Sequence, residues 1–121
     1  MKTKKTLVLG ASANPARYSY MAIKRLVDAG QPVVGIGLKE EEVAGVKIHT
    51  KQIPLKNIDT VTLYLNPARQ KDYYNYIIGL QPERVIFNPG TENPAFYQLL
   101  KANGIDVEVA CTLVMIATNQ Y

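Results

Sequence analysis

The chain alternates between short apolar runs and segments of helical periodicity, and this alternation restricts the fold more than any other feature. The predicted strands cover residues 6–11, 32–37, 60–65, 84–87 and 106–110. The first of them is a continuous apolar run, which is typical of a parallel strand that is covered on both faces. Strand–helix–strand repeats imply right-handed crossover connections. The sequence therefore predicts one α/β domain over residues 1–121, a Rossmann-like doubly wound parallel sheet of five strands in the order 3-2-1-4-5.

Helices are expected in four segments, at residues 19–29, 68–79, 93–104 and 111–119. Gly30 follows the first of them, where a C-cap glycine belongs. Asn66 and Asn93 are each followed by proline, so that each pair supplies an N-cap and a first helical residue. The segment after the second strand, residues 39–42, is a polar stretch.

Composition narrows the possible classes of protein. With 121 residues, 47% of them hydrophobic, the chain can form the core of one domain. Its longest apolar runs fall well below the roughly 18 residues of a membrane-spanning helix, and a single cysteine, Cys111, excludes an internal disulfide. The net charge of +4 favours anionic partners. The sequence lacks a basic block with interleaved aromatic residues, which would be typical of a nucleic-acid-binding surface. We expect a cytoplasmic protein that binds neither membranes nor nucleic acids.

The loop after the first strand, residues 10–19, carries the first functional signal. Gly10 allows a ligand to approach the backbone, and the N-terminus of the following helix offers free N–H groups to a phosphate. Ser12 and Ser19 add hydroxyls, and Arg17 adds a guanidinium that can bind a phosphate bidentately. The loop lacks the second and third glycines of the dinucleotide fingerprint G-x-G-x-x-G. It is a candidate phosphate site at the point where the strand order reverses, or alternatively an ordinary turn with a surface arginine.

Lys39 follows the second strand, where NAD enzymes place an acidic residue about 20 residues after the fingerprint. A lysine at this point would attract a phosphate on a ribose, and both NADP and coenzyme A carry such a phosphate. Residues 40–42 are all glutamate, and one of them could instead serve an NAD ribose. A solvated run of charges is the remaining interpretation.

The same residues resemble a known family. Gly10-Ala11-Ser12, followed by Arg17-Tyr18-Ser19, is similar to the opening motif of the small stand-alone coenzyme A (CoA)-binding proteins. These proteins share their fold with the CoA-binding domain of the succinyl-CoA synthetase α-subunit. The resemblance continues through residues 45–49, 53–54, 58–59, 87–92 and 106–111, and so covers nearly the whole chain.

The resemblance implies that CoA lies across the ends of the strands. Gly10, Ser12, Arg17 and Ser19 would hold the pyrophosphate, and Lys39 would lie near the 3′-phosphate. Ala11 and Tyr18 belong to the same loop motif and are further candidate contacts. By the same resemblance, Leu65 and Asn66 would border the adenosine side, and Asn88 and Gly90 the pantetheine arm.

Residues that could indicate an enzyme lack the partners that catalysis needs. His49, the single histidine, has no nucleophile or orienting group paired with it in the sequence. Cys111 is expected to be a buried thiol, or alternatively to face the thiol end of a bound cofactor. Tyr73, Tyr74 and Tyr76 are expected on a half-exposed helix face or at an interface.

The sequence therefore predicts a protein that binds CoA or acyl-CoA, has no chemistry of its own, and acts with a protein partner or as a homo-oligomer. An NADP-binding oxidoreductase-type domain and a nucleotide-sensing regulator are the alternatives.

Overall fold

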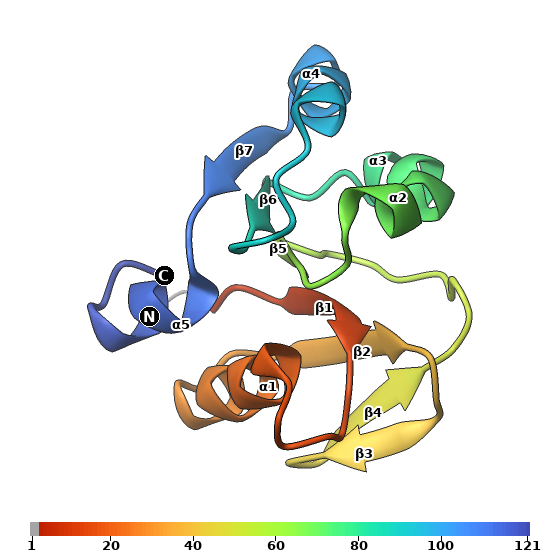
Figure 1. Ribbon diagram of the computed structural model, residues 1–121. Helices are drawn as coiled ribbons and strands as arrows, with labels where there is room; N and C mark the ends of the chain where they lie inside the picture. The colour runs from red at the N-terminus through yellow and green to blue at the C-terminus, as the bar shows by residue number, and fades with distance from the viewer. Residues whose placement is uncertain (1–2) are drawn as a thin grey trace.

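A mixed sheet crosses the molecule in the computed structural model, which describes residues 3–121 (Figure 1). In these residues the strands are β1 (Thr6–Ala11), β2 (Val33–Gly37), β3 (Glu41–Val43), β4 (Val46–His49), β5 (Thr60–Leu63), β6 (Arg84–Phe87) and β7 (Asp106–Val109). The helices are α1 (Tyr18–Asp28), α2 (Pro67–Gln70), the 3-10 turn η1 (Lys71–Tyr73), α3 (Tyr74–Leu80), α4 (Pro94–Ala102) and α5 (Thr112–Ala117).

The strand order corrects the prediction of five strands in the order 3-2-1-4-5. The described residues form a seven-stranded sheet in the order β3-β4-β2-β1-β5-β6-β7, and β3 runs antiparallel to its neighbour β4. The segment predicted as the third strand is β5, which pairs with β1 and not with β2. Counted along the chain, the parallel strands alone run 3-2-1-4-5-6, so the sheet is doubly wound but wider than expected.

The prediction is wrong because β3 and β4 form a hairpin where the sequence predicts a polar stretch. Its turn places Ala44 and Gly45 at φ of 51° and 80°, as a tight hairpin requires. Val43 and Val46 are buried, whereas Glu42 and Lys47 lie opposite each other on the exposed side. The apolar–polar alternation is therefore present but short, and acidic residues conceal it at the start of β3.

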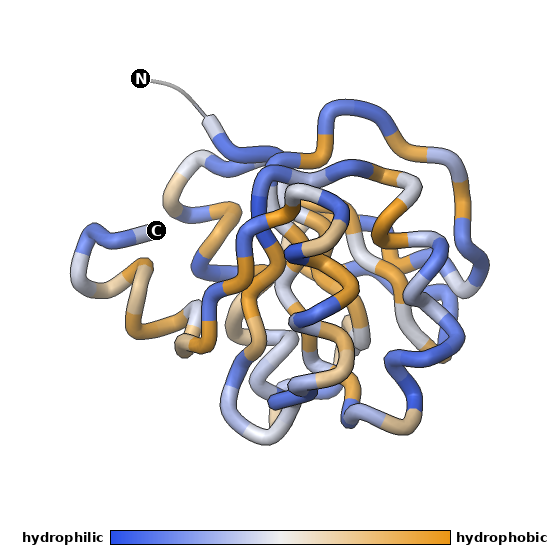
Figure 2. The backbone as a smooth tube through the Cα atoms, turned by 90° about the horizontal axis from the view of Figure 1, so that it is seen from above, coloured by the Kyte–Doolittle hydropathy of each residue, from blue (hydrophilic) through white to orange (hydrophobic). Residues whose placement is uncertain are grey.

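Helices cover both faces of the sheet (Figure 1). On β1, Leu7 and Leu9 face a core completed by Ile77 of α3 and by Phe96 and Leu100 of α4. The alternate residues of β1 pack on the other side, against α1 and, through Ile116, α5. Figure 2 shows the corresponding pattern, with the strongly apolar segments running through the interior and polar ones in the outer loops.

The segment predicted as one helix over residues 68–79 is interrupted by η1. Its three tyrosines, Tyr73, Tyr74 and Tyr76, are all half-buried. Tyr74 stacks on Phe96 at 4.2 Å between ring centroids, and its hydroxyl accepts a hydrogen bond from Asn93. Tyr76 donates to the Ile53 carbonyl. Both side chains therefore hold the fold together.

The amino ends of the central strands are closed by polar contacts around Arg84. Its guanidinium is paired with Glu108 at 2.9 Å and donates to the Thr60 hydroxyl at 2.9 Å and to the Tyr121 carbonyl at 3.2 Å. It also lies 4.6 Å from the centre of the Tyr121 ring. These contacts hold the C-terminal Tyr121 at the amino ends of the strands. The carboxyl ends of the strands remain open.

Gly37 is the position where the sheet is least able to accept a side chain. A Cβ atom there would lie 2.1 Å from the Ala11 carbonyl oxygen. We therefore expect Gly37→Ala to lower the free energy of unfolding by about 3 kcal/mol or more, since the clash is with backbone. Gly79→Ala is the matched control: it lies in α3 with no heavy atom near its Cβ and should gain about 0.5–1 kcal/mol. Urea unfolding of both variants measures the difference, and an unchanged midpoint for Gly37→Ala would contradict this account.

Candidate functional site

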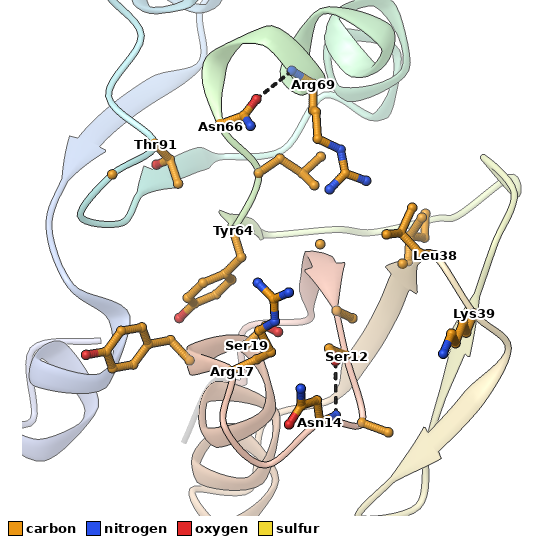
Figure 3. A pocket seen from close by; sticks show the side chains of 18 of the residues that line it. Ser12, Asn14, Arg17, Ser19, Leu38, Lys39, Tyr64, Asn66, Arg69 and Thr91 are labelled. Atoms are coloured by element: carbon orange, nitrogen blue, oxygen red, sulfur yellow. Dashed lines mark hydrogen bonds between the residues drawn. The ribbon is translucent and has the colours of Figure 1, made fainter.

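A cleft of about 730 Å³ opens at the carboxyl ends of the strands. Its walls come from four connections: the loop from β1 to α1, the segment between β2 and β3, the segment from β5 into α2, and the loop from β6 to α4. Figure 3 shows the side chains that line it. The cleft lies where the connections that follow β1 and β5 leave in opposite directions, toward β2 and toward β6, which is the usual place for a ligand in a doubly wound sheet.

The β1–α1 loop is held in shape by its own hydrogen bonds. The Ser12 hydroxyl accepts from the Asn14 amide, and the Asn14 side chain accepts from the Ala16 amide, both at 3.0 Å. Arg17 is the N-cap of α1 in an extended conformation, and its side chain makes no capping bond. The first amides of the helix, those of Tyr18 and Ser19, therefore have no intrahelical acceptor. These two residues line the cleft, where their amides and the positive end of the helix dipole attract anions.

Three cations line the cleft: Arg17, Lys39 and Arg69. Within residues 3–121 the single ion pair is Arg84–Glu108, at the opposite end of the sheet, so none of the three has an acidic partner. Glu41 is the one acidic residue among the described residues of the lining. The cleft therefore has an excess of positive charge.

Gln70 fixes two walls of the cleft relative to each other. It is fully buried, and its side-chain amide donates to the carbonyl oxygens of Leu65 and Thr91, both at 2.8 Å. Its own oxygen accepts from Asn93 at 2.9 Å. The end of β5 and the β6–α4 loop are thus tied together through one side chain. The sequence offered no signal for this role, since a glutamine near the start of a helix is ordinarily exposed.

Ten of the eleven predicted site residues line this one cleft: Gly10, Ala11, Ser12, Arg17, Tyr18, Ser19, Lys39, Leu65, Asn66 and Gly90. Asn88 is the exception, because its buried amide is used by the protein itself. It donates to the Thr62 hydroxyl at 2.7 Å and to the Leu63 carbonyl at 2.8 Å, and it accepts from the Thr112 amide at 2.9 Å. Asn88 therefore joins β5, β6 and α5 and does not border the cleft.

Leu65 and Asn66, which the resemblance puts on the adenosine side, lie on the other side of β1 from Lys39. The prediction placed strand three beside strand two, whereas β5 lies on the opposite side of β1 from β2. Leu65 and Asn66 consequently form the wall across β1 from Lys39 (Figure 3).

Several lining residues were not predicted, among them Glu41, Tyr64, Arg69 and Thr91. The hydroxyl of Tyr64 is buried and makes no hydrogen bond within the described residues. Burial raises the pKa of Tyr64 to about 12, although the Thr62 and Thr112 hydroxyls nearby act in the opposite direction.

The rim of the cleft carries two exposed apolar side chains, Tyr18 and Leu38, each of them 76% exposed. Such exposed apolar side chains beside a cleft suit contact with a flat ring.

Neither of the two residues considered for catalysis lines the cleft. His49 ends β4, and Cys111 is the half-buried N-cap of α5. Between residues 3 and 121 no group of three or more His, Cys, Asp or Glu side chains is placed to hold a metal ion. In the same residues, no helix has the length and apolar character needed to cross a membrane.

The chain is similar to several known proteins. The chain is similar to a crystal structure of an uncharacterized protein, with 45% sequence identity, 100% of both chains covered and a TM-score of 0.96. A hypothetical protein from Pyrococcus horikoshii OT3 is 26% identical over 98% of this chain and 84% of its own, with a TM-score of 0.85. The uncharacterized protein YneT of Bacillus subtilis (strain 168) is 29% identical over 107 residues, 85% of this chain and 77% of YneT.

A family model described as a CoA binding domain matches residues 4–117. These residues include every strand of the sheet described above and all four connections that wall the cleft. The protein therefore belongs to the family of CoA-binding domains.

Proposed function

We propose that this protein binds CoA or acyl-CoA in the cleft at the carboxyl ends of its strands and performs no chemistry on the ligand by itself. The observation that carries the proposal is the set of three unpaired cations, Arg17, Lys39 and Arg69, around one cleft. CoA carries a diphosphate and a separate 3′-phosphate, so it offers anionic groups at more than one point. Membership of the CoA-binding domain family supports this ligand over other anions.

The order of the walls suggests how CoA would lie. Lys39, beyond β2, would contact the 3′-phosphate, with Leu38 and Tyr18 beside the adenine ring. The β1–α1 loop, with Arg17 and the free amides of α1, would hold the diphosphate. The pantetheine arm would then run toward Gly90 and Thr91 at the end of β6.

The lining residues favour binding over catalysis. A general base works best with a pKa near the operating pH, and the pKa of Tyr64 is raised to about 12 by burial. Glu41 lies on the same side as Lys39, at the end where the adenosine would bind and far along the ligand from its thiol. The protein would thus hold the cofactor, or bring it to a partner.

NADP is the second candidate ligand, because Lys39 would attract a 2′-phosphate as well as a 3′-phosphate. Calorimetric titration of the full chain with CoA, NADP and NAD in one buffer separates them, and CoA should bind most tightly. CoA at about 100 times its dissociation constant should stabilise the fold by roughly 2.7 kcal/mol and raise the melting temperature by on the order of ten degrees. No shift with millimolar CoA, or tighter binding of NADP, would refute the proposal.

Arg17 should account for a large part of the affinity. A charge-assisted hydrogen bond shielded from water contributes roughly 1.5–3 kcal/mol, so Arg17→Ala should weaken CoA binding by about ten- to a hundred-fold. Arg17→Lys should restore only part of this, since lysine keeps the charge but not the planar fork. The melting temperature without ligand should not move, because Arg17 is exposed. Arg25→Ala, an exposed arginine of the same helix outside the cleft, is the control and should bind CoA normally.

Lys39 should decide selectivity for the ribose phosphate. CoA should bind more tightly than 3′-dephospho-CoA, and Lys39→Ala should narrow that difference and make CoA binding less dependent on salt. Lys51→Ala removes an exposed charge outside the cleft and should leave the difference intact. Equal affinities of the wild-type protein for the two ligands would remove Lys39 from the site.

A further inference from the structure

Arg69 has a fixed backbone and a free side chain. It belongs to α2, whose N-cap Asn66 accepts a hydrogen bond from the Arg69 amide at 2.9 Å through its side chain. The next residue, Gln70, is the buried side chain that ties β5 to the β6–α4 loop. The guanidinium of Arg69, in contrast, is exposed and has no ion-pair partner among residues 3–121. A cationic side chain whose backbone is fixed and whose charge has no partner is available to a ligand.

The side chain extends from the wall opposite Arg17. Figure 3 shows the two guanidinium groups pointing into the same space, Arg17 from the loop before α1 and Arg69 from α2. Two unpaired like charges that share a cleft repel each other, and an anion between them removes that cost. Two guanidinium groups are suited to binding a phosphate between them, because each presents a planar pair of donors to phosphate oxygens.

The position of Arg69 along the cleft shows which anion it would meet. The strands that contribute walls are arranged β2, β1, β5, β6, so Lys39, Arg17, Arg69 and Thr91 follow one another across the sheet. CoA is also linear, with its 3′-phosphate, its diphosphate and its pantetheine arm in that order. Given the proposed function, on which this step rests, Arg69 comes after the residues that hold the first phosphate and before those that meet the pantetheine.

We infer that Arg69 binds the phosphate of the CoA diphosphate that carries the pantetheine arm, opposite Arg17. The two arginines then clasp the diphosphate from the β5 side and the β1 side. Adenosine 3′,5′-bisphosphate, which has the 3′-phosphate and one 5′-phosphate but lacks this second phosphate, would not reach Arg69. This difference between ligands distinguishes a specific contact from a general effect of charge.

The test is calorimetric titration of the full-length variant Arg69→Gln with CoA, 3′-dephospho-CoA and adenosine 3′,5′-bisphosphate. The affinity for both CoA and dephospho-CoA should fall by about ten-fold, the loss expected for one charge-assisted contact. The affinity for the bisphosphate should change by less than about two-fold, which is much less than the loss of one such contact would cause. Arg69→Lys should recover part of the loss. Lys71→Gln is the matched control, since Lys71 is an exposed cation two residues further on that does not line the cleft.

Each alternative outcome has a separate meaning. If the wild-type protein binds CoA and Arg69→Gln binds it equally well, the inference is wrong and the proposed function stands. If the variant loses affinity for all three ligands alike, Arg69 acts through long-range charge and the assigned contact is wrong. If the wild-type protein does not bind CoA, the proposed function fails and the inference fails with it. An unchanged melting temperature of the ligand-free variant shows that any loss of affinity is not a loss of folding.

Discussion

The carboxyl end of β1 approaches its neighbours on both sides more closely than side chains would allow, and the site depends on this approach. A Cβ atom on Gly10 would lie 2.9 Å from the Tyr64 carbonyl oxygen, and one on Gly37 would lie 2.1 Å from that of Ala11. Gly10 also has a φ of 89°, in the region that glycine tolerates, and the register of β1 and β2 shifts beside it. The backbone can therefore turn out of the sheet into the phosphate-facing loop while β2 and β5 stay against β1.

The two ends of the sheet use charge in opposite ways. At the amino ends, the buried guanidinium of Arg84 is satisfied by Glu108, Thr60 and the Tyr121 carbonyl. That end is a closed polar network, and a buried arginine requires it. At the carboxyl ends the arginines Arg17 and Arg69 are exposed and unpaired within the described residues. A charge that the fold satisfies contributes to structure, whereas a charge left free beside a cleft is available to a ligand.

Much of the fold and of the site follows from local sequence, and the errors share one cause. Local patterns located β1, β6 and the β1–α1 loop, because continuous burial and a glycine at the strand end are properties of neighbouring residues. Strand order is not local: β5 was placed beside β2 because the short hairpin of β3 and β4 went unrecognised. The structural role of Asn88 is likewise not local, since its partners Thr62 and Thr112 are distant in sequence.

The corrected topology makes the cleft a better match to a linear ligand than the predicted one. In the predicted order, the strand that ends at Leu65 would have lain beyond β2. The wall after that strand and the wall that carries Lys39 would then have been on the same side of β1. In the observed order each wall follows the next, from Lys39 through the β1–α1 loop to α2 and then the β6–α4 loop. Gln70 joins the last two of these walls by hydrogen bonds to Leu65 and Thr91. The same short helix therefore sets the width of the cleft at its far end and presents Arg69 to it, so that spacing and charge at this point are not independent of each other.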